Sequence, residues 1–104
     1  MKLLKNLDEF NELIQNNNKV VIDFFANWCG PCHIISPYYE ELSNKYTNIT
    51  FVKVNIDEAQ DIADKCNISC MPTFHFYNNK MKINELNGAN QIQLKDYVDI
   101  LERK

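Results

Sequence analysis

The sequence predicts an α/β fold in which a mixed β-sheet carries helices on both faces. Two nearly continuous apolar runs, Val20–Phe25 and Thr50–Asn55, have the composition of strands that are buried on both faces. Cys32–Tyr46, between them, has helical spacing, so the two strands are expected to pair in parallel through a right-handed crossover. Asn78-Asn79 later separates two short runs and tolerates the positive φ of a tight antiparallel turn. The sheet is therefore predicted to be mixed.

The helices are predicted from capping residues and apolar stripes. Lys2–Leu4 can form a short first strand, after which Asn6 can cap a helix together with Glu9 in a capping-box-like pair. Pro37 lies inside the second helix, where it removes one backbone donor and predicts a kink. The apolar positions of the four helices are Phe10, Leu13 and Ile14; Ile34, Ile35, Tyr38, Tyr39, Leu42 and Tyr46; Ala59, Ile62, Ala63 and Cys66; and Leu94, Tyr97, Val98 and Leu101 after a cap at Asn90.

The last two strands are predicted at Thr73–Tyr77 and Lys80–Leu86, on either side of the asparagine turn. A chain of 104 residues and 12.3 kDa has room for one domain, residues 1–104. A formal net charge of −3 with scattered basic residues does not favour nucleic-acid binding. No apolar run approaches the roughly 18–20 residues that span a membrane. Charge follows Met1 too soon for a secretory signal, so we expect a cytoplasmic protein.

The chemistry is predicted at Trp28-Cys29-Gly30-Pro31-Cys32, between the first buried strand and the kinked helix. Two cysteines separated by two residues at a helix start can close a small disulfide ring. Free backbone N–H groups and the helix dipole favour the thiolate of the first cysteine, which is the attacking species in disulfide exchange. The second cysteine, one turn into the helix, is expected to be less exposed and suits a resolving thiol. The proline presets the helical φ, and the glycine leaves room for a partner's backbone.

These residues belong to a wider pattern that resembles the thioredoxin family over nearly the whole chain. The resemblance implies the thioredoxin fold, a central mixed sheet flanked by four helices, and protein-disulfide reduction without a bound cofactor. It also implies re-reduction by thioredoxin reductase and NADPH, and disulfide-containing protein substrates such as peroxiredoxins or ribonucleotide reductase. The matching motifs, in the family's order and spacing, are Val20-Val21-Ile22-Asp23-Phe24, the WCGPC motif, Lys53-Val54-Asn55-Ile56-Asp57, Met71-Pro72-Thr73-Phe74 and Gly88-Ala89.

The resemblance also implies roles for residues at the matching positions. Cys29 resembles the nucleophile and Cys32 the resolving cysteine. Asp23 resembles the buried carboxylate behind them, and Lys53 resembles its cationic neighbour. A shallow apolar docking surface, with a cis-proline at Pro72 facing the disulfide, is implied by Trp28, Gly30, Pro31, Met71, Pro72, Gly88 and Ala89.

A few positions depart from the family's usual pattern. His33 follows the second cysteine where lysine or arginine is usual, and Asn79 stands where a hairpin glycine is common. Cys66 and Cys70 are additions relative to many bacterial members, although animal-type members also carry extra thiols. Cys66 falls on an apolar helical stripe and is expected to be a small buried hydrophobe. Cys70 directly precedes Met71-Pro72, the part of the docking surface that we call the docking loop. Cys70 is expected to be an accessible regulatory thiol, able to link an otherwise monomeric protein into a dimer on oxidation.

Other interpretations of the cysteines stay open at the level of sequence. Cys29 and Cys32 could form a structural disulfide, or half of a zinc site that Cys66 and Cys70 complete. An oxidase or isomerase domain of the same fold is a rival function, but its usual Gly-His pair between the cysteines is absent. A non-catalytic binding module is a rival of another class.

The remaining candidate residues also have structural alternatives. Asp23 could lie at a strand end, although a carboxylate in a strand buried on both faces is costly unless it is paired or protonated. Lys53 could extend from a strand end to solvent. Pro72 could be a trans proline at the start of an edge strand, and Trp28 could belong to the core. His75 alternates with two phenylalanines, so it is expected to face away from the core that they fill.

Overall fold

A computed structural model describes all 104 residues as four helices and five strands. The chain alternates between the two kinds of element up to the final hairpin and helix, as the sequence pattern predicts. In chain order the elements are β1 Lys2–Leu3, α1 Leu7–Asn16, β2 Lys19–Phe25, α2 Gly30–Lys45, β3 Thr50–Asn55, α3 Gln60–Lys65, β4 Thr73–Asn78, β5 Met81–Asn87 and α4 Gln91–Glu102.

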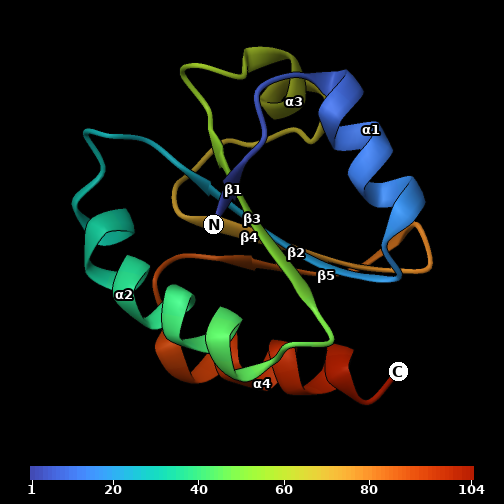
Figure 1. The fold of residues 1–104 in the computed structure, drawn as a ribbon. Coiled ribbons are helices and arrows are strands. Elements are labelled where there is room, and N and C mark those ends of the chain that lie inside the picture. The colour runs from blue at the N-terminus through green and yellow to red at the C-terminus, as the bar shows by residue number, and fades with distance from the viewer.

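The strands form one mixed sheet in the order β1-β3-β2-β4-β5. The pairs β1–β3 and β3–β2 are parallel, whereas β2–β4 and β4–β5 are antiparallel. Figure 1 shows α1 and α3 on one face of this sheet, with α2 and α4 on the other. The predicted fold class, a mixed sheet between four helices, is therefore confirmed. None of the helices is both long enough and apolar enough to span a bilayer.

Each face of the sheet has its own hydrophobic core, and alternation along the middle of β2 assigns its buried residues to one face or the other. Val21 packs into the core between the sheet and the pair α2 and α4. Val20, Ile22 and Phe24 pack into the core between the sheet and the pair α1 and α3. Asp23 therefore shares the face of Val21, under α2. This central strand is buried on both sides, as its continuous apolar composition predicts.

Side-chain caps fix the starts of α1 and α4 as predicted. Asn6 Oδ1 accepts a hydrogen bond from Glu9 N at 3.0 Å, and Asn90 Oδ1 accepts one from Gln93 N at 2.9 Å. In a capping box, the Glu9 side chain would also accept a hydrogen bond from the backbone N–H of Asn6. Here the donor is the preceding residue. Glu9 Oε1 accepts from Lys5 N at 2.9 Å, rather than from the backbone of the cap itself.

Helix α2 begins at Gly30, two residues earlier than predicted, and Cys29 occupies its N-cap position. The helix continues through Pro37. Its buried residues are Cys32, Ile35, Tyr39 and Leu42. The prediction that Ile34 belongs to the apolar stripe is wrong, because these positions take up the inward side and leave Ile34 74% exposed.

The predicted hairpin is present, but its turn lies one residue further along the chain. Asn78 pairs with Met81, and the residues with positive φ are Asn79, at 52°, and Lys80, at 72°. The two-residue loop is therefore Asn79-Lys80 rather than Asn78-Asn79, and β5 starts one residue later than predicted. The pairing register also shifts after Phe76, which leaves Ile83 as an extra residue in β5.

Candidate active site

Cys29 and Cys32 form a disulfide between the end of β2 and the start of α2, with their Cα atoms 5.3 Å apart. With Ala26 they make a small cluster, against which the half-buried side chains of Phe25, Ile56 and Met71 pack. The exposed fractions of the two cysteines are 5% and 4%, so burial does not distinguish them while the disulfide is formed. The asymmetry between the two sulfurs lies instead in their positions relative to the helix.

The Cys29 sulfur takes the place of an N-cap acceptor. Cys29 Sγ accepts a hydrogen bond from Cys32 N at 3.2 Å, and Pro31 lies in the first turn, where a missing N–H costs no helical hydrogen bond. After reduction, a thiolate at this position would keep that bond and face the positive end of the helix dipole. Both effects favour the ionised form of Cys29 over that of Cys32, which lies inside the helix.

Asp23 lies on the central strand beneath the helix that carries Cys32. It is 1% exposed, and its Oδ1 has no hydrogen-bond partner. Burial raises the pKa of Asp23 from 3.8 to about 7, although the nearby charge of Lys53 acts in the opposite direction. A carboxyl group with this pKa can both accept and release a proton near neutral pH.

Lys53 is the residue of β3 that pairs with Asp23 in the sheet register. Its ammonium group, however, is directed to α2, since Lys53 Nζ donates to Ser36 Oγ at 3.0 Å. The same nitrogen lies 5.2 Å from the centre of the Phe25 ring. Lys53 is thus a neighbouring charge but makes no ion pair with Asp23. Ser36 has no distinguishing signal in the sequence, and its part in holding Lys53 depends on the fold.

The loop before β4 contains the cis peptide bond Met71–Pro72, as the resemblance implies. Gly88 N donates to Pro72 O at 2.8 Å, which ties the two loops of the docking surface together. Gly88 has a φ of +103°, a conformation in which glycine is favoured over any residue with a side chain. Thr73 strengthens the same loop, because its Oγ1 lies 2.7 Å from Cys70 O.

Trp28 is 68% exposed and does not belong to the core. Its indole Nε1 donates to Asp57 Oδ2 at 2.9 Å, which holds the ring beside the disulfide. Asp57 was not singled out from the sequence, although it closes the Lys53–Asp57 motif. Of the other residues assigned to the docking surface, Gly30 and Pro31 are exposed, Met71, Gly88 and Ala89 are half-buried, and Pro72 is buried.

Gly30 faces open space, and a Cβ added there would meet no atom within 4 Å. This agrees with the expectation that Gly30 leaves room for another chain. His33, where the family usually has lysine or arginine, is exposed and bonded through Nε2 to Asn27 O at 2.6 Å. The imidazole is therefore held against the loop that precedes the disulfide.

The other two cysteines are free thiols in different regions. Cys70 is exposed beside the docking loop, with its Sγ 3.6 Å from Thr73 Oγ1. Cys66 is half-buried and packs into the core under α1 and α3, where burial raises the pKa of its thiol. No three or more His, Cys, Asp or Glu side chains lie together as a metal site, so the zinc interpretation lacks its ligand set.

The comparisons with known proteins agree with this geometry. The thioredoxin family model matches residues 2–100. A thioredoxin from Coprinus comatus is 47% identical over 100 residues, covering 94% of each chain. The structure of Plasmodium falciparum thioredoxin is 43% identical, covers 96% of this chain and 98% of its own, and has a TM-score of 0.94. A chain from a structural study of thiol resolution in yeast mitochondrial 1-Cys peroxiredoxin via the glutathione and thioredoxin systems is 40% identical, covers 97% and 95%, and has a TM-score of 0.94.

Both the disulfide motif and the fold around it are thus shared with thioredoxins over nearly the full length of the chains. Proteins of this kind reduce disulfides in other proteins by dithiol–disulfide exchange and are re-reduced by thioredoxin reductase and NADPH. The chain belongs to the thioredoxin family, and the Cys29–Cys32 pair makes it a thiol–disulfide oxidoreductase.

Proposed function

We propose that this protein is a cytoplasmic thioredoxin in which Cys29 attacks, Cys32 resolves and Asp23 moves the proton. The observation that carries the proposal is the hydrogen bond from Cys32 N to Cys29 Sγ at the start of α2. It supports Cys29 as the sulfur whose thiolate the helix stabilises, and hence as the nucleophile.

In the first step, the Cys29 thiolate attacks one sulfur of a substrate disulfide. A bond forms between Cys29 and that sulfur, the substrate S–S bond breaks, and the second substrate sulfur leaves as a thiolate that takes up a proton. The exposed ring of Trp28 and the Met71-Pro72 loop bind the apolar surroundings of the substrate disulfide. Gly30 and the Gly88-Ala89 segment allow the substrate backbone to approach closely.

In the second step, the Asp23 carboxylate accepts the proton of the Cys32 thiol. The Cys32 thiolate then attacks Cys29 Sγ, which forms the Cys29–Cys32 disulfide and releases the first substrate sulfur as a thiolate. The proton held by Asp23 returns to solvent or to the released sulfur. Counted from the Cys29 thiolate, the protein loses two electrons and one proton, the substrate gains two electrons and two protons, and solvent supplies the second proton. Lys53, held by Ser36, moderates the pKa of Asp23 from a short distance without neutralising it.

Four further features complete the proposed function. The protein needs no bound cofactor, because the cysteine pair itself carries the electrons and NADPH acts only through the reductase. Its substrates are disulfide-containing proteins such as peroxiredoxins or ribonucleotide reductase, and the peroxiredoxin context of a similar yeast chain supports the first of these. The two free thiols, Cys66 and Cys70, suit a reducing compartment, which supports the cytoplasm. The protein works as a monomer that Cys70 can link into a dimer on oxidation.

The proposal is tested by measuring NADPH oxidation with thioredoxin reductase, insulin disulfides and a catalytic amount of this protein. Many turnovers per molecule are expected for the wild type and for a Cys66→Ser control, and none for Cys29→Ser. An oxidase or isomerase would favour disulfide formation in reduced substrates instead, and a binding module would give no turnover. Either result would contradict the proposed function.

A further inference from the structure

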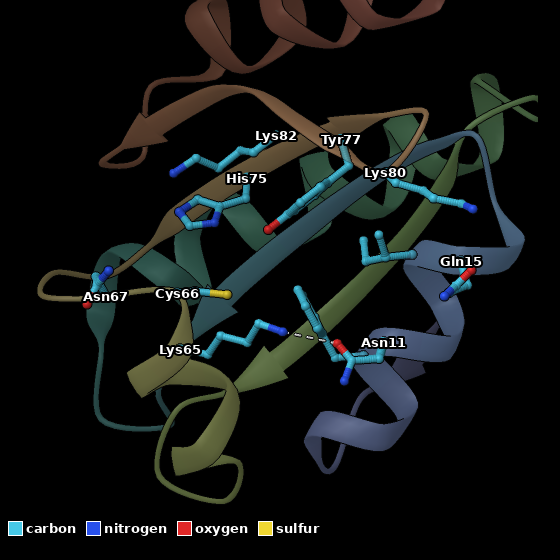
Figure 2. A pocket seen from close by; sticks show the side chains of 11 residues that line it. Asn11, Gln15, Lys65, Cys66, Asn67, His75, Tyr77, Lys80 and Lys82 are labelled. Atoms are coloured by element: carbon cyan, nitrogen blue, oxygen red, sulfur yellow. Dashed lines mark hydrogen bonds between the residues drawn. The ribbon is translucent and has the colours of Figure 1, made fainter.

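The largest pocket of the molecule does not lie at the disulfide. It has a volume of about 560 Å³, within the roughly 300–1,000 Å³ of small-molecule sites, and it opens on the face covered by α1 and α3. None of its 11 lining residues belongs to the docking surface. Figure 2 shows side chains that enter it from α1, from the end of α3, from β4 and from the hairpin. Disulfide exchange as described above has no use for this pocket.

The polar lining of the pocket is cationic. Lys65, Lys80 and Lys82 line it, and no acidic residue does, although the whole chain has a formal net charge of −3. Lys65 Nζ donates only to the neutral amide of Asn11, at 3.2 Å, and Lys80 makes no side-chain hydrogen bond or ion pair. Lys82 is paired with Glu85 at 2.9 Å. Two of the three ammonium groups are thus without a counter-ion.

The backbone is distorted at two places where it delivers these lysines. In a regular strand, Lys82 and Glu85 would point to opposite faces, because they are three residues apart. The extra residue at Ile83 brings both to the face of His75 and Tyr77, and re-aiming of side chains is a known use of β-bulges. Lys80 adopts a φ of 72°, where glycine or asparagine is the ordinary residue of such a turn.

A buried histidine forms the inner wall. His75 is 1% exposed, and neither of its ring nitrogens has a hydrogen-bond partner. Its Nε2 lies 3.1 Å from Glu85 Oε1, which is within ion-pair distance, and its Nδ1 has no partner. Buried polar atoms normally have partners, and Nδ1 of this imidazole has none, so a buried histidine beside a cationic pocket points to a ligand that supplies an acceptor.

The apolar lining lies next to this polar group. Phe10 and Tyr77 are in edge-to-face contact with ring centroids 6.1 Å apart, and Ile14 extends their surface along α1. Figure 2 shows Tyr77 extending from β4 with its hydroxyl towards Cys66, while Asn11 and Gln15 lie on α1. A ligand that fills this space therefore needs a flat apolar part in addition to an anionic group.

We propose that this pocket binds a phosphate-bearing small molecule with an aromatic body, of about the size of a nucleoside monophosphate. The ammonium groups of Lys65, Lys80 and Lys82 lie on different sides of the pocket in Figure 2, and their flexible side chains turn towards the phosphate on binding. His75 donates to one phosphate oxygen, and the aromatic body lies against Phe10 and Tyr77. Compact, strongly hydrated ammonium groups suit phosphate, which does not require the planar fork of arginine. The site is separate from the disulfide surface, so its occupation does not depend on the proposed catalytic roles.

The test is a titration of the isotopically labelled oxidised protein, followed by amide chemical shifts, with three probes. AMP has both the phosphate and the aromatic ring, ribose 5-phosphate lacks the ring, and adenosine lacks the phosphate. AMP is expected to shift residues 10–15, 65–67 and 75–82, and to bind about tenfold more tightly than either fragment. No shift with AMP, or equal affinity for AMP and a fragment, overturns the proposal.

A pair of matched variants shows whether the pocket itself is responsible. The pocket variant carries Lys65→Gln, Lys80→Gln and Lys82→Gln, and the control carries Lys2→Gln, Lys45→Gln and Lys104→Gln, which removes the same charge elsewhere. AMP is expected to bind about tenfold more weakly to the pocket variant, and about as tightly as wild type to the control. Equal weakening in both would mean non-specific attraction and would overturn the proposal. Insulin reduction should be unchanged in both variants, which verifies that they fold.

Discussion

The disulfide lies where β2 ends and α2 begins, whereas the His75 pocket opens on the face of the sheet covered by α1 and α3. The two regions nevertheless contain similar kinds of residue. Each has one buried ionisable side chain without a full set of partners, Asp23 on β2 and His75 on β4. Each also has one free cysteine, Cys70 beside the docking loop and Cys66 in the pocket. Only the first region has a disulfide that these groups can serve.

The difference between the two regions shows that burial alone does not make a catalytic residue. Burial favours the neutral form in both cases, so it raises the pKa of Asp23 to about 7 and lowers the pKa of His75 to about 4. At neutral pH, Asp23 therefore exchanges protons, whereas His75 stays neutral. Asp23 is suited to acid–base chemistry, and His75 is suited to hydrogen bonding with a fixed partner.

The largest expected effect is at the disulfide itself. Cys32→Ser should abolish the reduction of insulin disulfides by NADPH and thioredoxin reductase, because the mixed disulfide on Cys29 can no longer be resolved. The variant should accumulate that mixed disulfide, measured by mass spectrometry on non-reduced samples. The matched Cys29→Ser variant should trap no substrate. Trapping through Cys32 in that variant, with none in Cys32→Ser, would reverse the assigned order.

The second prediction concerns the kinetic role of Asp23. Asp23→Asn should slow the resolution of the mixed disulfide by about 10²-fold, the lower end of what a positioned general base contributes, and should leave its formation nearly unchanged. Stopped-flow measurement of both steps between pH 6 and 9 checks this. Equal rates in wild type and variant for both steps would remove Asp23 from the mechanism.

The raised pKa of Asp23 also predicts how the stability of the fold depends on pH. Between about pH 4 and 7 the folded protein keeps Asp23 protonated while the unfolded chain ionises it, so the folded state binds more protons and stability falls as pH rises. Asp23→Asn should abolish this fall and be more stable above pH 7 by about 4 kcal/mol, at 1.36 kcal/mol per pKa unit. Urea unfolding at pH 5 and pH 8 measures it, with the exposed Asp96→Asn as control.

The corresponding effect of pH on stability at His75 is smaller than the effect at Asp23 and has the opposite sign. The folded state binds fewer protons at His75 than the unfolded chain, so stability is lost as pH falls from about 6.5 to about 4. His75→Phe should lose this acid sensitivity and gain about 1 kcal/mol at pH 7, since unpaired polar atoms are replaced by a ring against Phe24. The control is His33→Gln, which changes an exposed histidine. The prediction would be contradicted if His75→Phe lost as much stability at acidic pH as the wild type and this control.

The smallest expected effect separates the two free thiols. In the oxidised protein, Cys70 should react with a thiol reagent about tenfold faster than Cys66, because Cys70 is exposed and burial raises the pKa of Cys66. Comparing Cys66→Ser with Cys70→Ser measures each rate alone. Mild oxidation should give a dimer on a non-reducing gel for Cys66→Ser and none for Cys70→Ser. A dimer in both variants would exclude Cys70 as the linking thiol.

The sequence predicts the site around the disulfide better than it predicts the pocket, because the disulfide site is encoded by local sequence patterns. The WCGPC motif, the Asn6 and Asn90 caps and the strand–helix–strand order each depend on residues close together in the chain. The sequence predicts the hairpin turn one residue too early, because asparagine suits either position and the register of β4 with β5 decides between them. The apolar stripe predicted for α2 includes the exposed Ile34, because the apolar pattern of the helix is broader than its buried side.

By itself, the sequence determined the order of the elements, the parallel pairing of β2 with β3, the antiparallel hairpin of β4 with β5, and the cysteines that meet at a helix start. Only the tertiary structure decided which side chains face each other across the sheet. Lys53 is aligned with Asp23 in register, yet it bonds to Ser36 on α2 and leaves Oδ1 of Asp23 unpaired. One extra residue in β5 brings Lys82 and Glu85 to the face of His75. Both outcomes depend on distances between segments far apart in the chain, and local periodicity carries no record of such distances.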